Sequence, residues 1–286
     1  MLLCLATKKH IKQKKWKEAA NGACNLGELL QLCGELDKAV KLTRRSVQLA
    51  DKSHDVFKRL RNRAMLAAAL HANGLQAEAA MQFEEAERIQ KKWQPAYPLI
   101  YSPGFYYCDL LLAQGWDTDV QQRAEKALQI ATRNHWLLNI ALDHLSLGRA
   151  HLLAIQRNAA GDRAQAAFHF KQAVDGFRRG GQQGELPLGL LARAALHIHT
   201  GDFAAARHDL DDTLTLSVRC GFRLHEADAH LGLARLALAE NTLAPAREHL
   251  ATARRIVRET GYHRRDGELT ALDAEAAARS EPGATR

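Results

Sequence analysis

The chain has 286 residues, of which 47% are hydrophobic and only 6% are aromatic. Leucine and alanine dominate and strand-favouring residues are sparse, so the composition predicts an all-α protein and excludes a β-rich one. The formal net charge of +8 leaves nucleic acid, acidic protein surfaces and anionic lipid open as partners.

Residues 1–15 are expected to be a basic lead-in or the end of a preceding helix. Lysines gather there, at Lys8, Lys9, Lys12, Lys14, Lys15 and Lys17. The apolar run before them is too short for a signal peptide, and the lysines follow it instead of preceding it. No apolar run in the sequence approaches the length of a membrane helix. The five cysteines show neither metal-ligand nor disulfide spacing. A cytoplasmic protein without a membrane segment is therefore predicted.

From residue 16 to residue 262 the sequence repeats a pair of helices joined by a sharp turn. Residues that tolerate a left-handed turn recur about 40 residues apart, at Gly34, Gly74, Gly115, Gly161, Gly201 and Asn241. Five residues after each turn stands a small residue: Ala39, Ala79, Val120, Ala166, Ala206 and Ala246. Small side chains let crossing helices approach closely. One pair cannot bury its apolar face alone, so stacked pairs in one repeat domain are predicted.

Three stretches depart from this regularity. Pro95, Pro98 and Pro103 are expected to interrupt the helix after the second pair. A Gly-rich loop at 179–187 is expected to be a flexible joint. Residues 263–286 should hold a short capping helix, about 269–278, followed by a disordered tail.

The pattern resembles the tetratricopeptide repeat (TPR). The resemblance is carried by a large–small pair before the turn, by the turn residue, and by an alanine–large–alanine series after it, best seen in Leu66-Ala67, Gly74, Ala79, Phe83 and Ala86. It implies a right-handed superhelical solenoid of about six TPR-like pairs. The period near 40 exceeds the usual one of about 34, and the proline that commonly ends the family's second helix is missing. Such longer pairs resemble the C-terminal repeat arrays of large bacterial signal-transduction NTPases.

This resemblance implies a non-enzymatic interaction scaffold or ligand-sensing domain within a larger regulatory protein. In TPR arrays the first helices line a concave groove, where a peptide or protein partner binds. Spacing from the turns places charged residues on or near that face, namely Arg61, Asp109, Arg149, Asp228 and Arg235. Faces of helices that pack inward usually avoid charge, so these five are candidates for partner binding. The alternative is that they pair with one another across neighbouring repeats.

The aromatic stretch 93–107 supplies two further candidates, Tyr101 and Tyr106. Aromatic side chains with polar tips suit binding surfaces. The alternative is a wedge between the second and third pairs. No basic residue is interleaved between positions 94 and 118, which counts against the stacking of nucleic-acid bases there.

No catalytic signature is present: the sequence contains no phosphate-binding loop and no nucleophile elbow. His225 and His230 are five residues apart, about 140° around a helix, so they cannot share one metal ion. No enzymatic activity, metal or cofactor is predicted. The alternative function is a nucleic-acid-associated regulator that uses basic groups at 8–17 and 254–265. Solvated helix faces are the simpler explanation of both groups.

Overall fold

The computed structural model describes residues 2–157 and 162–279, with side chains from Leu5 onward. These ranges contain fourteen α-helices and one 3₁₀-helix, and no strand occurs in them. The prediction of an all-α protein is confirmed. Gly161 and the tail Ser280–Arg286 lie outside the described residues. Within the described ranges no helix is long and apolar enough to cross a membrane.

The helices follow one another with short connections. Their bounds are α1 Leu2–Lys12, α2 Trp16–Leu32, α3 Leu36–Ser53, α4 Val56–Ala72, α5 Gln76–Trp93, α6 Tyr101–Gln114, α7 Asp117–Arg133, α8 Leu137–Gln156, α9 Arg163–Arg179, α10 Leu186–Thr200, α11 Phe203–Cys220, α12 Arg223–Ala239, α13 Leu243–Thr260, η1 His263–Arg265 and α14 Asp266–Ala278. Pairs such as α2–α3, α4–α5, α8–α9 and α12–α13 pack side by side, and each pair packs on the next. The first helices α2, α4, α6, α8, α10 and α12 also contact one another in sequence order.

The predicted turn residues end the first helices in the expected conformation. Gly34, Gly74, Gly115 and Gly201 have φ between +79° and +85°, and Asn241 has φ +58°. These residues adopt the left-handed conformation. Residues with a Cβ disfavour this conformation unless, like Asn, they carry a short polar side chain. The turn predictions at these five positions are confirmed.

Small residues before the turn meet large residues nine positions after it. A Cβ added to Gly148 of α8 would lie 2.6 Å from the ring of Phe170 in α9. The equivalent Cβ at Gly27 of α2 would lie 2.5 Å from Thr43 Cγ2 in α3. The large–small pattern therefore reflects helix crossings where no extra atom fits.

Ala206 offers a direct test of this repeat register. It is 0% exposed at the crossing of α10 and α11, so Ala206→Leu should lower the free energy of unfolding by about 1–3 kcal/mol through overpacking. Ala204 lies two residues away on the exposed face, and Ala204→Leu is the matched control. Urea denaturation followed by circular dichroism compares the two. Equal stability of both variants would contradict the register.

One proline departs from the prediction. Pro95 and Pro98 lie in the irregular segment 94–100, as predicted, but Pro103 is the third residue of α6 and is buried. The prediction that Pro103 interrupts a helix is wrong. Amide groups in the first turn of a helix have no intrahelical acceptor, so a proline there removes no helix hydrogen bond.

Arg193 of α10 lies at a repeat position before the turn that is occupied by an apolar residue in the other pairs. Its Nε and Nη2 donate to the two carboxylate oxygens of Asp209 in α11, each over 2.7 Å. The carboxylate is 2% exposed. A bidentate arginine–carboxylate pair therefore replaces the apolar contact at this crossing.

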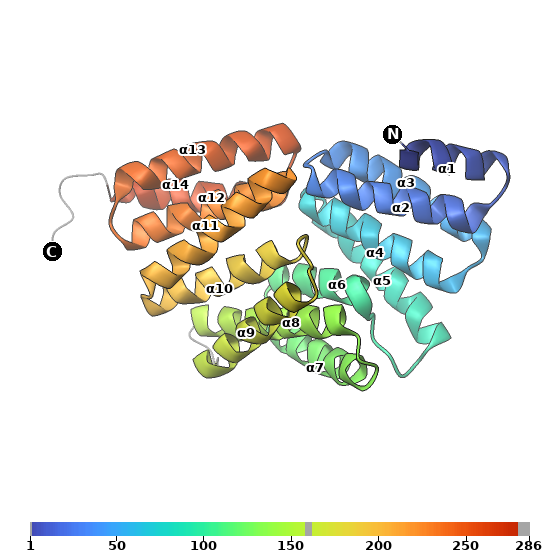
Figure 1. Ribbon diagram of the computed structural model, residues 1–286, viewed down its shortest axis with the longest axis horizontal. Helices are drawn as coiled ribbons and strands as arrows, with labels where there is room; N and C mark the ends of the chain where they lie inside the picture. Colours follow the sequence, from blue (N-terminus) through green and yellow to red (C-terminus); the bar gives the residue numbers. More distant parts are fainter. Residues whose placement is uncertain (1, 158–161, 280–286) are drawn as a thin grey trace.

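The chain curls so that its last elements reach its first ones (Figure 1). Helix α12 contacts α2, and η1 contacts α4. A Cβ at Gly34 would lie 2.4 Å from Thr260 Cγ2, and one at Gly74 would lie 3.0 Å from His263 Cβ. Leu36 belongs to the same buried cluster as residues of α12, α13 and α14. This closure encloses the faces of the first helices.

Candidate functional site

The inner faces of the first helices surround a cavity of about 280 Å³, which we call the inner cavity. Its walls come from α2, α4, α6, α8, α10 and α12, together with the C-terminal η1 and α14. Leu188, Leu191 and Ile198 of α10 form much of its apolar wall. The ionisable groups that line it are His71, Tyr106, Asp109, Arg149, Glu185, His225, Asp228, Arg235, Tyr262, Arg264, Arg265 and Glu268.

Five of the seven predicted site residues line this cavity: Tyr106, Asp109, Arg149, Asp228 and Arg235. The structure thus brings together residues from α6, α8 and α12 that lie far apart in the sequence. Their role in binding a partner stays a prediction.

Arg61 and Tyr101 do not line the cavity. Arg61 of α4 donates from Nη2 to Glu28 Oε2 over 2.8 Å. The Tyr101 ring lies 6.2 Å from Phe57 and 4.8 Å from Trp136, measured between ring centroids. Tyr101 therefore packs between helix pairs, as the wedge alternative states. A role of these two residues in binding a partner outside the cavity stays a prediction.

Asp109 is the centre of an ion-pair network. Its carboxylate accepts from Arg149 Nη2 over 2.5 Å and from both Nη atoms of Arg264, one of them over 2.9 Å. His71 Nε2 lies 3.9 Å from the same carboxylate. Burial alone would raise the pKa of Asp109, but Arg264 and Arg149 hold it well below its ordinary range. Asp109 is therefore ionised, and it joins α6 to α8 and to η1.

Asp228 and Glu268 form a second centre. Arg265 Nε donates to Asp228 over 2.7 Å, and its Nη1 donates to Glu268 over 2.9 Å. Arg235 Nη2 lies 2.6 Å from Glu268 Oε1, and the Tyr262 hydroxyl donates to Asp228 over 3.2 Å. The alternative of pairing across repeats holds directly for Asp109 with Arg149, whereas Asp228 and Arg235 pair with residues of η1 and α14.

The position of η1 in the interior changes the interpretation of the basic group predicted at 254–265. Arg264 and Arg265 lie in the cavity wall and not on an exposed surface. Arg254 pairs with Asp273, and Arg255 lies 3.0 Å from Glu259. No repeat pattern could indicate the contact of Arg264 with Asp109, because it depends on the closure. The nucleic-acid alternative keeps the exposed Arg255 and Arg258 and the lysines at 8–17, one of which, Lys17, pairs with Asp55 over 2.6 Å.

One histidine in the cavity wall, His71, has no hydrogen-bond partner among the described residues. It is 4% exposed, and neither of its ring nitrogens is satisfied. His225 is 7% exposed, and its ring lies at the backbone of Gly184, which supplies a hydrogen bond. Burial and the nearby Arg264 lower the pKa of His71 to about 3, and burial lowers that of His225. Burial raises the pKa of Glu185 at the same cavity. Buried polar groups are normally satisfied, so this wall offers hydrogen bonds to a ligand.

The side chain of His230 does not share a site with that of His225. Its Nδ1 lies 3.0 Å from Nδ1 of His249 in α13. Across the described side chains, no group of three or more His, Cys, Asp or Glu residues is placed to hold a metal ion.

No family model and no curated protein sequence matches this chain. The site is therefore interpreted from its own geometry.

Proposed function

We propose that the chain is a right-handed superhelical solenoid of about six TPR-like pairs that serves as a cytoplasmic, non-enzymatic ligand-sensing domain. Its ligand binds in the inner cavity. The observation that carries the proposal is the buried His71 in the cavity wall, because neither of its ring nitrogens has a hydrogen-bond partner. A native wall that leaves hydrogen-bonding groups unmatched is expected to be completed by a bound molecule.

The size of the cavity favours a small molecule or a short peptide segment. The inner cavity of about 280 Å³ adjoins a second one of about 500 Å³. Sites for small molecules typically have volumes of about 300–1,000 Å³. A partner helix with its side chains has a diameter of about 10 Å or more, so these volumes suit a small molecule or an extended peptide segment better.

The walls also supply a means of signalling. His71 and Asp109 come from the N-terminal half, while Asp228, Arg264 and Arg265 come from the C-terminal end. A ligand that contacts both groups stabilises the closed arrangement relative to any open one. Within a larger protein, this shift would change how the ends of the array contact an effector domain.

Ala195 allows a test that does not depend on knowing the ligand. It lines both cavities, so Ala195→Trp should fill the interior. We expect at least one member of a panel of acetylated tripeptides, organic acids, amines and polyols to raise the Tm of the wild type at millimolar concentration. The Ala195→Trp variant should lose that shift, and Ala204→Trp on the exposed face should keep it.

Two outcomes would reject the proposal. One is a panel in which no member raises the Tm of the wild type. The other is an equal shift in the wild type and in Ala195→Trp, because the ligand would then bind outside the interior.

A further inference from the structure

The second cavity, which we call the outer cavity, has a cationic wall. Its ionisable side chains are Arg149, His199, Arg235, Arg264 and Arg265, and no described carboxylate lines it. Ala192, Ala195 and Ile198 of α10 form part of its apolar wall and also line the inner cavity. The two cavities therefore meet along α10, with the arginines at their junction.

The carboxylates that pair with these arginines all lie on the other side of the junction. Asp109, Asp228 and Glu268 line the inner cavity but not the outer one. The arginines thus face carboxylates on the inner side and no carboxylate on the outer side. Four arginines face three carboxylates, so the junction keeps one unbalanced positive charge, which attracts an anion.

Arg149 and Arg235 keep hydrogen-bonding capacity for such an anion. Each contacts its carboxylate through Nη2, Arg149 over 2.5 Å and Arg235 over 2.6 Å. Their side chains are 25% and 44% exposed. A guanidinium carries five N–H donors in a planar fork, so one contact leaves donors that can bind a carboxylate or phosphate oxygen.

We infer that the ligand of this interior is a small organic oxyanion, a carboxylate or a phosphate monoester, with a largely apolar body. This inference rests on the proposed function and adds the chemical class of its ligand. The oxyanion binds Arg149 and Arg235 at the junction, and the body lies against Ala192, Ala195 and Ile198. A hydroxyl or carbonyl group at the far end of the natural ligand would satisfy His71.

Matched six-carbon probes separate the head group from the body. Hexanoate, hexyl phosphate, hexanamide and hexylammonium share an apolar chain and differ in head group and charge. We expect at least one of the two anions to bind the wild type ten times or more tightly than hexanamide, measured by isothermal titration calorimetry. The tighter anion identifies carboxylate or phosphate as the source. Hexylammonium is the critical competitor, because Glu185 also lines the inner cavity.

Arg235→Gln is the main variant, since Glu268 keeps Arg265 as a partner when Arg235 is lost. It should weaken binding of the preferred anion about tenfold and leave hexanamide unchanged. Arg149→Gln should do the same, with Asp109 still paired to Arg264. Arg178 is a 46% exposed arginine outside both cavities, and Arg178→Gln should bind all four probes like the wild type.

Hexanamide or hexylammonium binding as tightly as both anions would overturn the oxyanion assignment. If that binding is also lost in Ala195→Trp, the proposed function still stands and only the ligand class is wrong. If none of the four probes binds, the oxyanion assignment is overturned too. The proposed function is then decided separately by the panel of tripeptides, organic acids, amines and polyols. An anion preference that survives in Arg235→Gln and in Arg149→Gln would also contradict it.

Discussion

Asp109→Ala is expected to lower the free energy of unfolding by about 3 kcal/mol, because it leaves two partly buried arginines without their shared carboxylate. Asp109 has a 14% exposed side chain and accepts from Arg149 and Arg264. Arg264 has a side chain that is 17% exposed and has no carboxylate partner within 4 Å other than Asp109 among the described residues. Urea denaturation monitored by circular dichroism measures the loss.

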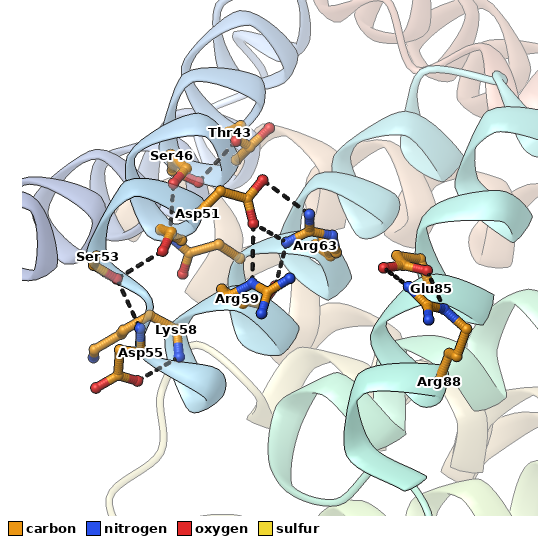
Figure 2. Close-up of polar contacts among 12 residues, drawn as sticks. Thr43, Ser46, Asp51, Ser53, Asp55, Lys58, Arg59, Arg63, Glu85 and Arg88 are labelled. Atoms are coloured by element: carbon orange, nitrogen blue, oxygen red, sulfur yellow. Dashed lines mark hydrogen bonds and ion pairs between the residues drawn. The ribbon is translucent and has the colours of Figure 1, made fainter. Parts of the chain in front are cut away.

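Asp51 provides the matched control. Its carboxylate also accepts from two arginines, Arg59 over 3.2 Å and Arg63 over 2.9 Å, and Figure 2 shows its contacts with both. The Asp51 side chain is 41% exposed, and Arg63, which is 12% exposed, keeps a hydrogen bond to the carbonyl of Arg59 when Asp51 is lost. Asp51→Ala should therefore cost about 1 kcal/mol, less than Asp109→Ala. Equal losses for the two variants would show that Asp109 is not the buried centre described above.

The second large effect is a loss of stability in mild acid that depends on His71. In the folded chain its pKa is lowered to about 3 by burial and by Arg264, whereas an unfolded histidine has a pKa of about 6.5. The stabilisation is therefore fully present above about pH 6.5. It is lost as the pH falls towards 3, because the unfolded chain binds a proton that the fold excludes. The expected slope from this group is about 1.4 kcal/mol per pH unit.

The comparison is between wild type and His71→Gln, which keeps a neutral polar side chain. The groups that face His71 are Asp109, Arg149, Arg264 and Arg265, from α6, α8 and η1. The nearby carboxylates raise the pKa of Arg264 and of Arg265, and the lowered pKa of Asp109 keeps it ionised. Unfolding free energies are measured at pH 6.5, 5.5 and 4.5. As the pH falls, that of the wild type should fall more steeply than that of His71→Gln, with a difference in slope that corresponds to the uptake of about one more proton on unfolding. Parallel lines for the two proteins would refute a neutral buried His71.

Local features of the repeat were predictable from the sequence because they depend on neighbours along the chain. The left-handed residues at Gly34, Gly74 and Asn241 follow from the backbone conformation that ends a helix. The small residue at Ala206 follows from the crossing of adjacent helices. Pro103 was misplaced because the start of α6 could not be located to within one turn, and a first helical turn tolerates proline.

The candidate site was predictable only on the side formed by the first helices. Asp109, Arg149 and Asp228 share a face that the repeat spacing identifies. Arg264 reaches Asp109 only because the chain closes, since the two residues are 155 positions apart in the sequence. No periodic pattern encodes a contact between the third pair and the end of the last, so Arg264 was assigned to an exposed basic group instead.

The closure of the chain through Asp109 and Arg264 is the basis of the proposed ligand-binding interior. A double-mutant cycle with Asp109→Ala, Arg264→Ala and the double variant tests it most directly, with unfolding free energies measured in urea. A buried, doubly hydrogen-bonded pair should give a coupling energy of about 1.5–3 kcal/mol between these distant positions. Effects that add within about 0.5 kcal/mol would contradict the contact, and with it the enclosed cavity.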